Sequence, residues 1–223
     1  MLSNGFTKAH IPAFTQARRI FVVLAGGRSL RMGSDKCLLM YEGATLLNRA
    51  ETLAHGLAHS AVVLSGEPRE GSLPSSIFIT DLPEFHLLGP LGGIASVLQT
   101  LQKAGLRLET KTFLVLPVDM PALKLPELES LVAQLDQDPE LDAVHFEASV
   151  LPLAFRPIPE LLNTLYRLTH SATPDAVRNF GEFLKTSRTK VLDVSARDAA
   201  AFRNVNSPED FRRLQTSCPK GEL

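Results

Sequence analysis

The sequence is poor in cysteine, in long apolar runs and in net charge, and each shortage excludes a class of protein. Only two cysteines occur among 223 residues, Cys37 and Cys218, so neither a disulfide framework nor a cysteine metal site can be drawn. No stretch approaches the roughly 18 apolar residues of a membrane helix. Residues 1–19 lack the apolar core of a secretory signal. These absences favour a cytoplasmic protein without a membrane partner.

Length and charge point to one globular domain without a nucleic-acid partner. Hydrophobic residues make up 44% of the chain and charged residues 21%, an ordinary balance for a domain with a full apolar core. The formal net charge is -1, whereas binding to a nucleic-acid backbone usually requires a basic excess. We expect one domain at residues 19–217, a flexible leader at 1–18 and a tail at 218–223. A packing role for the leader stays open.

Short runs rich in β-branched residues alternate with helical apolar periods, which predicts an α/β fold. The first run, IFVVL at residues 20–24, is unbroken and therefore fits a strand buried on both faces. The predicted fold class is a single-domain, three-layer sandwich around a mostly parallel, mixed sheet. Strands are expected at 20–24, 61–65, 77–80, 112–117, 142–146 and 149–155, and helices at 46–58, from 89 onwards and at 125–135.

Two local signals refine this arrangement. Residues 142–146 and 149–155 are joined too tightly for a parallel crossover, so one of these strands should run antiparallel. Thr173 and Ser207 each stand directly before a proline, which predicts that a helix begins at each site. The acidic residues that follow Ser207-Pro208 fit a capping box.

The strongest chemical signal is the loop after the first strand, which reads LAGGRSLRMGSDK over residues 24–36. Its three glycines allow the backbone to approach a ligand closely, and exposed N–H groups can then hold phosphate oxygens. Arg28, Arg31 and Lys36 add three cations, a combination that suits a triphosphate. The loop follows the carboxyl end of a buried strand, where α/β sheets usually bind ligands. A solvated glycine turn with surface arginines is the alternative.

Two familiar phosphate-binding motifs do not fit this loop. The G-x-G-x-x-G pattern is absent because Gly26 and Gly27 are adjacent, and the P-loop pattern fails because two residues separate Gly33 from Lys36. A Rossmann-type dehydrogenase and a P-loop kinase therefore have poor support.

Polar residues also follow the other predicted strands. Asp119 comes after the fourth strand, and a carboxylate at that edge can hold Mg²⁺ together with substrate phosphates. Asp81 comes after the third strand, where contact with a base or ribose and the start of a turn are both open. Gly92 either lets a nucleotide base lie against the backbone or begins a helix close to the sheet. For Asn204 and Asn206, a side chain in a cleft and simple turn chemistry both stay open.

Together these motifs resemble the signature of molybdenum cofactor guanylyltransferases, which belong to the nucleotide-diphospho-sugar transferase superfamily. The resemblance rests on the blocks LAGG, RMG, DKCLL, GPLGG, PVDMP and NVNSPE, which follow the family's order over about residues 19–215. It implies a Rossmann-like fold. It also implies transfer of GMP from GTP to molybdenum-bearing molybdopterin, which forms the guanine dinucleotide cofactor and releases pyrophosphate.

The resemblance also implies roles for individual residues. Asp119 would bind Mg²⁺, or Mn²⁺ in its place, and would act in catalysis with Lys36 and Arg31. Asn204 and Asn206 would lie on the pterin side. The residues that the family places at the nucleotide are Leu24, Ala25, Gly26, Lys36, Asp81 and Asp119. The loop argument adds Gly27, Arg28 and Arg31, and the separate argument on the later glycine segment adds Gly92.

The sequence departs from the family at one point. Residues 64–67 read LSGE, where relatives often carry an asparagine that contacts the nucleotide. Backbone groups or Ser65 are the candidates to replace it, and the choice of base depends on them. Adjacent Gly26 and Gly27 favour guanylyl transfer, because cytidylyl-transferring relatives tend to read LAAG.

The expected mechanism is in-line attack by an acceptor phosphate on the α-phosphorus of the nucleotide, with charge neutralisation supplying most of the catalysis. One alternative is a related enzyme that uses CTP or another NTP on molybdopterin, a sugar phosphate or a polyol phosphate. Another is a nucleotide-binding regulator or cofactor carrier without turnover. The family also implies transient contact with molybdenum-insertion proteins and with molybdoenzymes or their chaperones.

Overall fold

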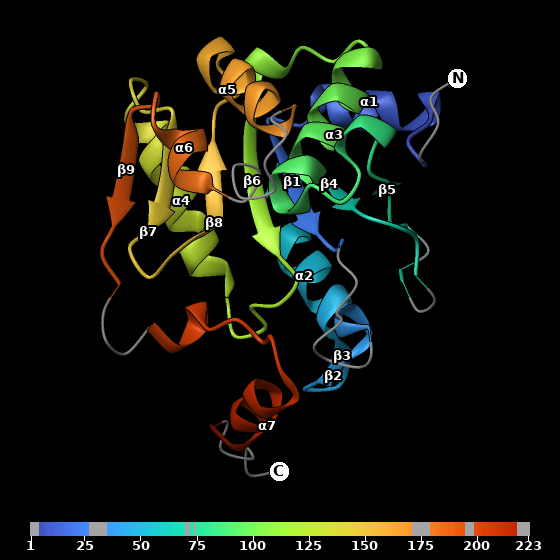
Figure 1. The fold of residues 1–223 in the computed structure, drawn as a ribbon, viewed down its shortest axis with the longest axis vertical. Coiled ribbons are helices and arrows are strands. Elements are labelled where there is room, and N and C mark those ends of the chain that lie inside the picture. The colour runs from blue at the N-terminus through green and yellow to red at the C-terminus, as the bar shows by residue number, and fades with distance from the viewer. Residues whose placement is uncertain are drawn as a thin grey trace.

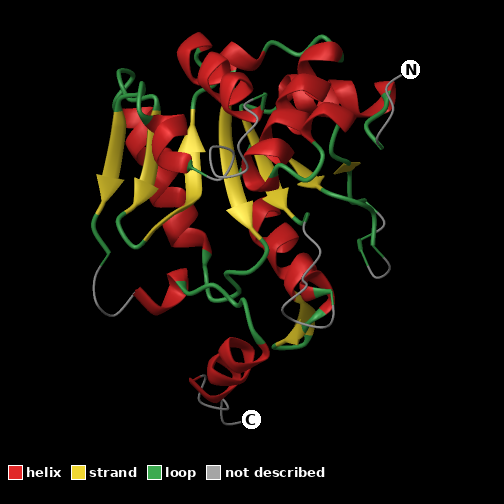
Figure 2. Ribbon diagram, viewed as in Figure 1, coloured by secondary structure: helices red, strands yellow, loops and turns green. Residues whose placement is uncertain are grey.

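The protein folds around one seven-stranded sheet that carries helices on both faces (Figures 1 and 2). The computed structural model describes residues 5–26, 35–69, 72–73, 75–170, 179–194 and 199–217. The strand order is β5-β4-β1-β6-β8-β7-β9. The strands are β1 (Arg19–Leu24), β4 (Ser60–Ser65), β5 (Phe78–Ile79), β6 (Thr112–Pro117), β7 (Ala143–Phe146), β8 (Ser149–Phe155) and β9 (Thr189–Leu192).

Strand directions confirm the predicted mostly parallel, mixed sheet. β1 pairs in parallel with both β4 and β6, β4 pairs in parallel with β5, and β7 pairs in parallel with β9. β8 is antiparallel to both of its neighbours, β6 and β7. The short connection between Phe146 and Ser149 explains the reversal, because a parallel crossover needs a dozen or more residues.

Successive side chains of β1 point to opposite faces of the sheet, and the core has one layer on each face. Ile20 and Val22 pack on one face of the sheet with α1, α3, α5 and α6, whereas Phe21 and Val23 pack on the other face with α2 and α4. This arrangement confirms the predicted three-layer sandwich. The helices are α1 (Ile11–Gln16), α2 (Leu46–His55), α3 (Gly89–Lys103), α4 (Leu125–Gln137), α5 (Pro159–Thr169), α6 (Phe180–Leu184) and α7 (Pro208–Ser217). Within the described ranges, none of them has the length and apolar character needed to cross a bilayer.

Two predicted elements are shorter than expected, and one lies outside the described residues. α2 ends at His55 instead of residue 58, and the Gly56 N–H caps its last turn by donating to the carbonyls of Thr52 and Leu53. β5 contains only Phe78–Ile79. The helix predicted after Thr173 falls outside the described residues.

The N-terminal segment differs from the flexible leader that the sequence suggested. Phe6 and Phe14 are fully buried and pack edge to face with ring centroids 5.1 Å apart. The buried Lys111 side chain donates from Nζ to the carbonyls of Thr15 and Ala17, both at 2.6 Å. A buried ammonium needs such acceptors, so this contact holds the end of α1 against the start of β6. Residues 5–17 therefore pack on the domain, with Phe6, Phe14 and Ala17 buried in its core.

Candidate active site

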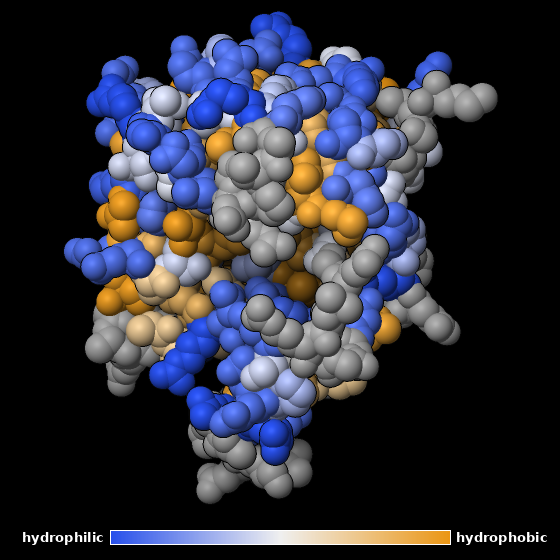
Figure 3. All heavy atoms as spheres, in the orientation of Figure 1, coloured by the Kyte–Doolittle hydropathy of each residue, from blue (hydrophilic) through white to orange (hydrophobic). Residues whose placement is uncertain are grey.

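The carboxyl ends of β1 and β6 form the floor of a cavity of about 380 Å³. The two strands are neighbours in register, with Leu24 opposite Pro117, and the Val118 N–H donates to the Leu24 carbonyl at 3.3 Å. Both strands end at this edge, and Lys36, which follows β1 in the sequence, lies there beside Asp119, which follows β6. Figure 3 shows this face hollowed near its centre, close to where the two strands end in Figure 1. The polar and glycine residues on its wall include Gly26, Lys36, Asp119, Ser149 and Asn204.

Lys36 and Asp119 form an ion pair on the wall of this cavity. The Lys36 ammonium donates from Nζ to Asp119 Oδ2 at 2.9 Å, and also to Asn206 Oδ1 at 2.9 Å. The side chains of Lys36 and Asp119 are 15% and 20% exposed, so the pair is largely desolvated yet still open to a ligand. The predicted meeting of these two residues at one cavity is therefore what the structure describes.

Local sequence explains how Lys36 is presented. A short 3-10 helix, η2 (Lys36–Leu38), begins after Asp35, whose carboxylate accepts the Cys37 N–H at 3.0 Å. The other oxygen of Asp35 accepts from Arg69 Nε at 2.6 Å. Burial alone would raise the pKa of Asp35, but the hydrogen bonds from Arg69 and the Cys37 backbone outweigh it, so the pKa is lowered. The Asp35 carboxylate thus caps the turn that presents Lys36, and its lowered pKa favours the ionised form that accepts these hydrogen bonds.

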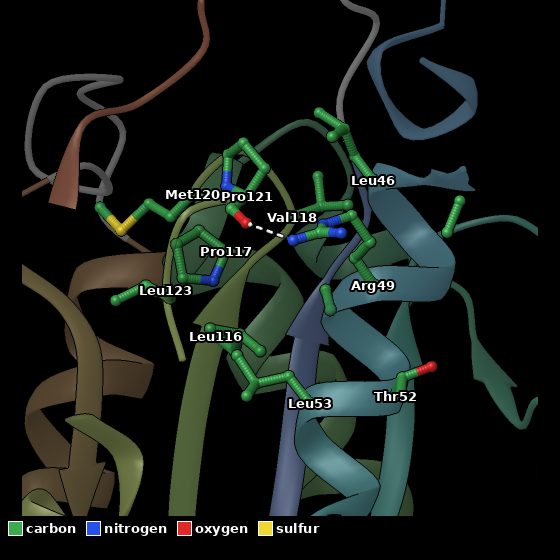
Figure 4. A pocket seen from close by; sticks show the side chains of 12 residues that line it. Leu46, Arg49, Thr52, Leu53, Leu116, Pro117, Val118, Met120, Pro121 and Leu123 are labelled. Atoms are coloured by element: carbon green, nitrogen blue, oxygen red, sulfur yellow. Dashed lines mark hydrogen bonds between the residues drawn. The ribbon is translucent and has the colours of Figure 1, made fainter. Parts of the chain in front are cut away.

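The loop that carries Asp119 is held from behind by α2. Arg49 donates from Nη2 to the Pro121 carbonyl at 3.2 Å, the contact drawn in Figure 4. The same guanidinium pairs with Glu42 at 2.9 Å and lies 4.8 Å from the centre of the Tyr41 ring. It spans a second hollow of about 310 Å³, whose walls are mostly aliphatic. This hollow offers little acid or base chemistry, and Arg49 acts in it as a support for the loop.

Residues 65 and 66, where relatives often carry an asparagine, have structural roles of their own. The Ser65 carbonyl accepts the Ala25 N–H at 3.0 Å, and the Ser65 side chain is buried against α3. Gly66 has φ +134°, and a Cβ at this position would lie 2.9 Å from the Gly26 nitrogen. The two loops therefore cross with almost no space between them. Ser65 is not among the described residues that line the cavity.

Three predicted nucleotide contacts lie apart from the cavity wall. Ala25 is fully buried, and Asp81 and Gly92 are also absent from the described residues that line the cavity. A Cβ on Gly92 would lie 2.7 Å from the Phe85 carbonyl, so close packing of α3 already requires this glycine. Burial raises the pKa of Asp81, partly offset by His86. Gly27, Arg28 and Arg31 fall outside the described residues.

Two contributors to the site were not identified from the sequence. Arg69 was not singled out, because it lies in an irregular loop 34 residues beyond its partner Asp35. The contact of Asn206 with Lys36 was also missed, although Asn206 itself was singled out by its place before the Ser207-Pro208 cap. Single polar residues such as Arg69 and Asn206 form no periodic pattern in the sequence, so the sequence does not indicate which distant residues they contact.

The chemistry available here is the binding of phosphate groups. A buried thiol, Cys37, lies on the cavity wall, but burial raises its pKa to about 12, so it is a poor nucleophile. Among the described residues no group of three His, Cys, Asp or Glu side chains is placed to hold a metal ion. A lysine, one carboxylate and a glycine backbone remain, which suit an anionic ligand that brings its own cation.

Comparison with known proteins identifies the family. The model of the MobA-like NTP transferase domain matches residues 21–182. A molybdenum cofactor guanylyltransferase from Xanthomonas euvesicatoria pv. vesicatoria is 36% identical, over 86% of this chain and 92% of its own. Two solved structures share the fold. The molybdopterin-guanine dinucleotide biosynthesis protein A of Archaeoglobus fulgidus is 22% identical, with a TM-score of 0.66 over 89% of this chain and 98% of its own. A Mycobacterium tuberculosis protein solved in complex with manganese is 18% identical, with a TM-score of 0.58 over 91% of this chain and 100% of its own.

The family match spans most of the first strand, the lysine and aspartate at the cavity, and α2 to α5, which cover both faces of the sheet. The nucleotidyltransferase assignment therefore covers Lys36 and Asp119, whereas Asn204 and Asn206 lie beyond the matched residues. The chain belongs to the MobA-like NTP transferase family.

Proposed function

We propose that this protein transfers GMP from GTP to molybdenum-bearing molybdopterin, which forms the guanine dinucleotide cofactor and releases pyrophosphate. The observation that carries the proposal is the Lys36–Asp119 pair at 2.9 Å in a cavity at the carboxyl edge of the sheet. The guanylyltransferase from Xanthomonas, 36% identical, supports the choice of GTP and of the acceptor.

In the proposed reaction a terminal phosphate oxygen of the acceptor attacks the α-phosphorus of GTP. The new P–O bond forms as the bond to the β-phosphate oxygen breaks, and the electron pair leaves with pyrophosphate. The acceptor phosphate is already ionised, so no general base is required. Lys36 would stabilise the charge that develops on the phosphates, and Arg28 and Arg31 are proposed to assist it. Gly26, at the cavity wall, would let the phosphates approach the backbone.

The residues present fit a divalent cation that arrives with the nucleotide. Mg²⁺ at such sites is held by one or two carboxylates together with substrate phosphates, and Asp119 supplies one carboxylate at the cavity wall. When bound there, Mg²⁺ or Mn²⁺ would offset the negative charge of the phosphates. Asp119 already pairs with Lys36, so the triphosphate would have to replace the carboxylate as the partner of Lys36.

The remaining assignments concern the outer parts of the two ligands. Asp81 is proposed to meet the base or ribose, and Leu24, Ala25, Gly27 and Gly92 to shape the nucleotide side. Asn204, at the cavity wall, is proposed for the pterin side. The proposed protein partners are molybdenum-insertion proteins, which deliver the acceptor, and molybdoenzymes or their chaperones, which receive the product.

The test is pyrophosphate release measured with GTP, CTP, ATP and UTP, each with and without molybdopterin and Mg²⁺. We expect release with GTP only when molybdopterin is present. Lys36→Ala and Asp119→Ala should each lower kcat by about 10²–10³, because each removes a group that offsets charge in the transition state. Lys103→Ala, on the exposed part of α3, is the matched control and should turn over normally.

The outcomes separate the alternatives. A preference for CTP, or turnover with a sugar or polyol phosphate, would move the protein to a related transferase. GTP binding without any pyrophosphate release would indicate a regulator or carrier. Normal turnover in both site variants, with folding confirmed by circular dichroism, would contradict the proposed site.

A further inference from the structure

The lysine at the cavity is held by a residue from the C-terminal end of the chain. Lys36 Nζ lies 2.9 Å from Asn206 Oδ1, a contact that spans 170 residues of sequence. A lysine ammonium has donors only, so the amide atom that faces it must be the oxygen. Asn206 therefore contributes, with Asp119 at 2.9 Å, to the placement of the Lys36 charge in the cavity.

Backbone hydrogen bonds from Val205 and from Asn206 itself hold Asn206 in place. The preceding residue, Val205, has a buried side chain, and its N–H donates to the main-chain carbonyl of Asp119 at 2.8 Å. The Asn206 N–H donates to Asp210 Oδ2 at 3.1 Å. The C-terminal segment is thus bonded directly to the loop that supplies the carboxylate.

The contact with Asp210 belongs to the N-terminal cap of α7. Ser207 accepts the Asp210 N–H at 3.1 Å and donates from its hydroxyl to Asp210 Oδ2 at 2.8 Å. The predicted capping box is present in a modified form, because the carboxylate takes the N–H of Asn206 as well as the Ser207 hydroxyl. Upstream, Phe202 packs on Phe146 with ring centroids 4.6 Å apart. The segment between these two anchors is thus held at both ends.

We propose that Asn206 is a positioning residue for Lys36, held in place by the α7 cap, and that its amide oxygen orients the lysine toward the nucleotide phosphates. The proposal rests on the proposed function of the cavity. It assigns Asn206 to the nucleotide half-reaction and not to contact with the acceptor, the role that the sequence resemblance implied. It also gives α7, which extends beyond the carboxyl edge of the sheet in Figure 1, a part in arranging the site.

The discriminating measurement is GTP binding in the absence of any acceptor, by isothermal titration with Mg²⁺ on the full chain. Asn206→Ala should weaken GTP affinity by up to about tenfold, because Lys36 is then no longer held in one orientation and must be ordered when GTP binds. Asp210→Ala, which frees the backbone of Asn206, should cause a smaller loss in the same direction. Glu209→Ala is the control in the same helical turn, since Glu209 pairs only outward with Arg213 at 2.6 Å among the described residues, and it should bind GTP normally.

A double-mutant cycle tests whether Asn206 acts through Lys36. Once Lys36→Met has removed the ammonium, Asn206→Ala should cost nothing further, whereas a general structural effect would add to the first loss. GTP affinity that is unchanged in Asn206→Ala, with a loss only after molybdopterin is added, would overturn the proposal in favour of an acceptor contact. An equal loss in the Lys36→Met background would overturn it as well. If Lys36→Met alone leaves GTP affinity unchanged, the proposed function of the cavity fails instead.

Discussion

Replacement of Gly66 by alanine should both destabilise the protein and weaken nucleotide binding. The backbone at Gly66 has φ +134°, a conformation that residues with a side chain rarely adopt. A Cβ there would lie 2.9 Å from the Gly26 nitrogen and 3.1 Å from the Ala25 carbonyl carbon. Both are backbone atoms at the end of β1, so they cannot move aside as the tip of a flexible side chain could.

The size of the effect follows from two separate costs. A residue held in a disfavoured backbone region costs about 1–3 kcal/mol, and forcing an extra carbon into a packed contact costs about 1–3 kcal/mol. A combined loss near 4 kcal/mol would lower the unfolding temperature by about 8–16 °C in a chain of this size. If the contact is relieved by a shift of Gly26, the cavity wall moves with it, and GTP affinity falls in the protein that remains folded.

Thermal and urea unfolding, followed by titration with GTP, would measure both effects. Gly105→Ala is the matched control, because Gly105 also has a positive φ of +86° but its Cβ would meet nothing within 4 Å. It should lose only the conformational cost, about 1–2 kcal/mol, and should bind GTP as the wild type does. If Gly66→Ala is no less stable than Gly105→Ala, the contact with Ala25 and Gly26 does not restrict the size of residue 66, and the reasoning is refuted.

Two further predictions concern ionisable groups. Burial raises the pKa of Asp81, with a smaller raising effect from Glu67 and a lowering one from His86, so the folded protein binds this proton more tightly than the unfolded chain does. Ionised Asp81 therefore costs stability at neutral pH. Urea denaturation should find Asp81→Asn more stable than the wild type at pH 7. This difference should vanish as the pH falls below about 3.9, the usual pKa of aspartate. Because burial raises the pKa of Cys37 to about 12, iodoacetamide at pH 8 should leave Cys37 unlabelled in the native protein and label it in urea, as peptide mass spectrometry would show. Labelling at equal rates in both states would contradict that burial.

The elements that were predicted from sequence are those with a one-dimensional physical signature. β1 and β6 are unbroken apolar runs because both of their faces are covered, and such runs are easily recognised. β9 was not predicted, because it is an edge strand whose residues are only partly buried or exposed. α5 was also missed, although its signal was present: Pro159 begins the helix, and the buried leucines at 161, 165 and 168 have helical spacing.

The same distinction applies to the residues of the site. Lys36 and Asp119 could be predicted to meet because each follows a strong central strand, and the carboxyl ends of neighbouring parallel strands share one edge. The partners that orient Lys36 could not be predicted. Arg69 reaches Asp35 from an irregular loop, and Asn206 reaches Lys36 from the far end of the chain. Contacts of this kind depend on the exact paths of loops, which residue spacing does not encode.

On the proposed function, the Lys36–Asp119 pair is best understood as a charge-balanced resting arrangement. A lysine or a carboxylate left alone in a largely buried site would bear an uncompensated desolvation cost, and pairing at 2.9 Å offsets it. A triphosphate with its divalent cation carries both signs of charge. The phosphates can take the place of Asp119 beside Lys36, and the cation can take the place of Lys36 beside Asp119. Binding is then an exchange of ion pairs and does not require either group to be stripped of its partner. Asn206, which is neutral, can keep its hydrogen bond to Lys36 throughout this exchange, and that is why an amide suits the position better than a second carboxylate would.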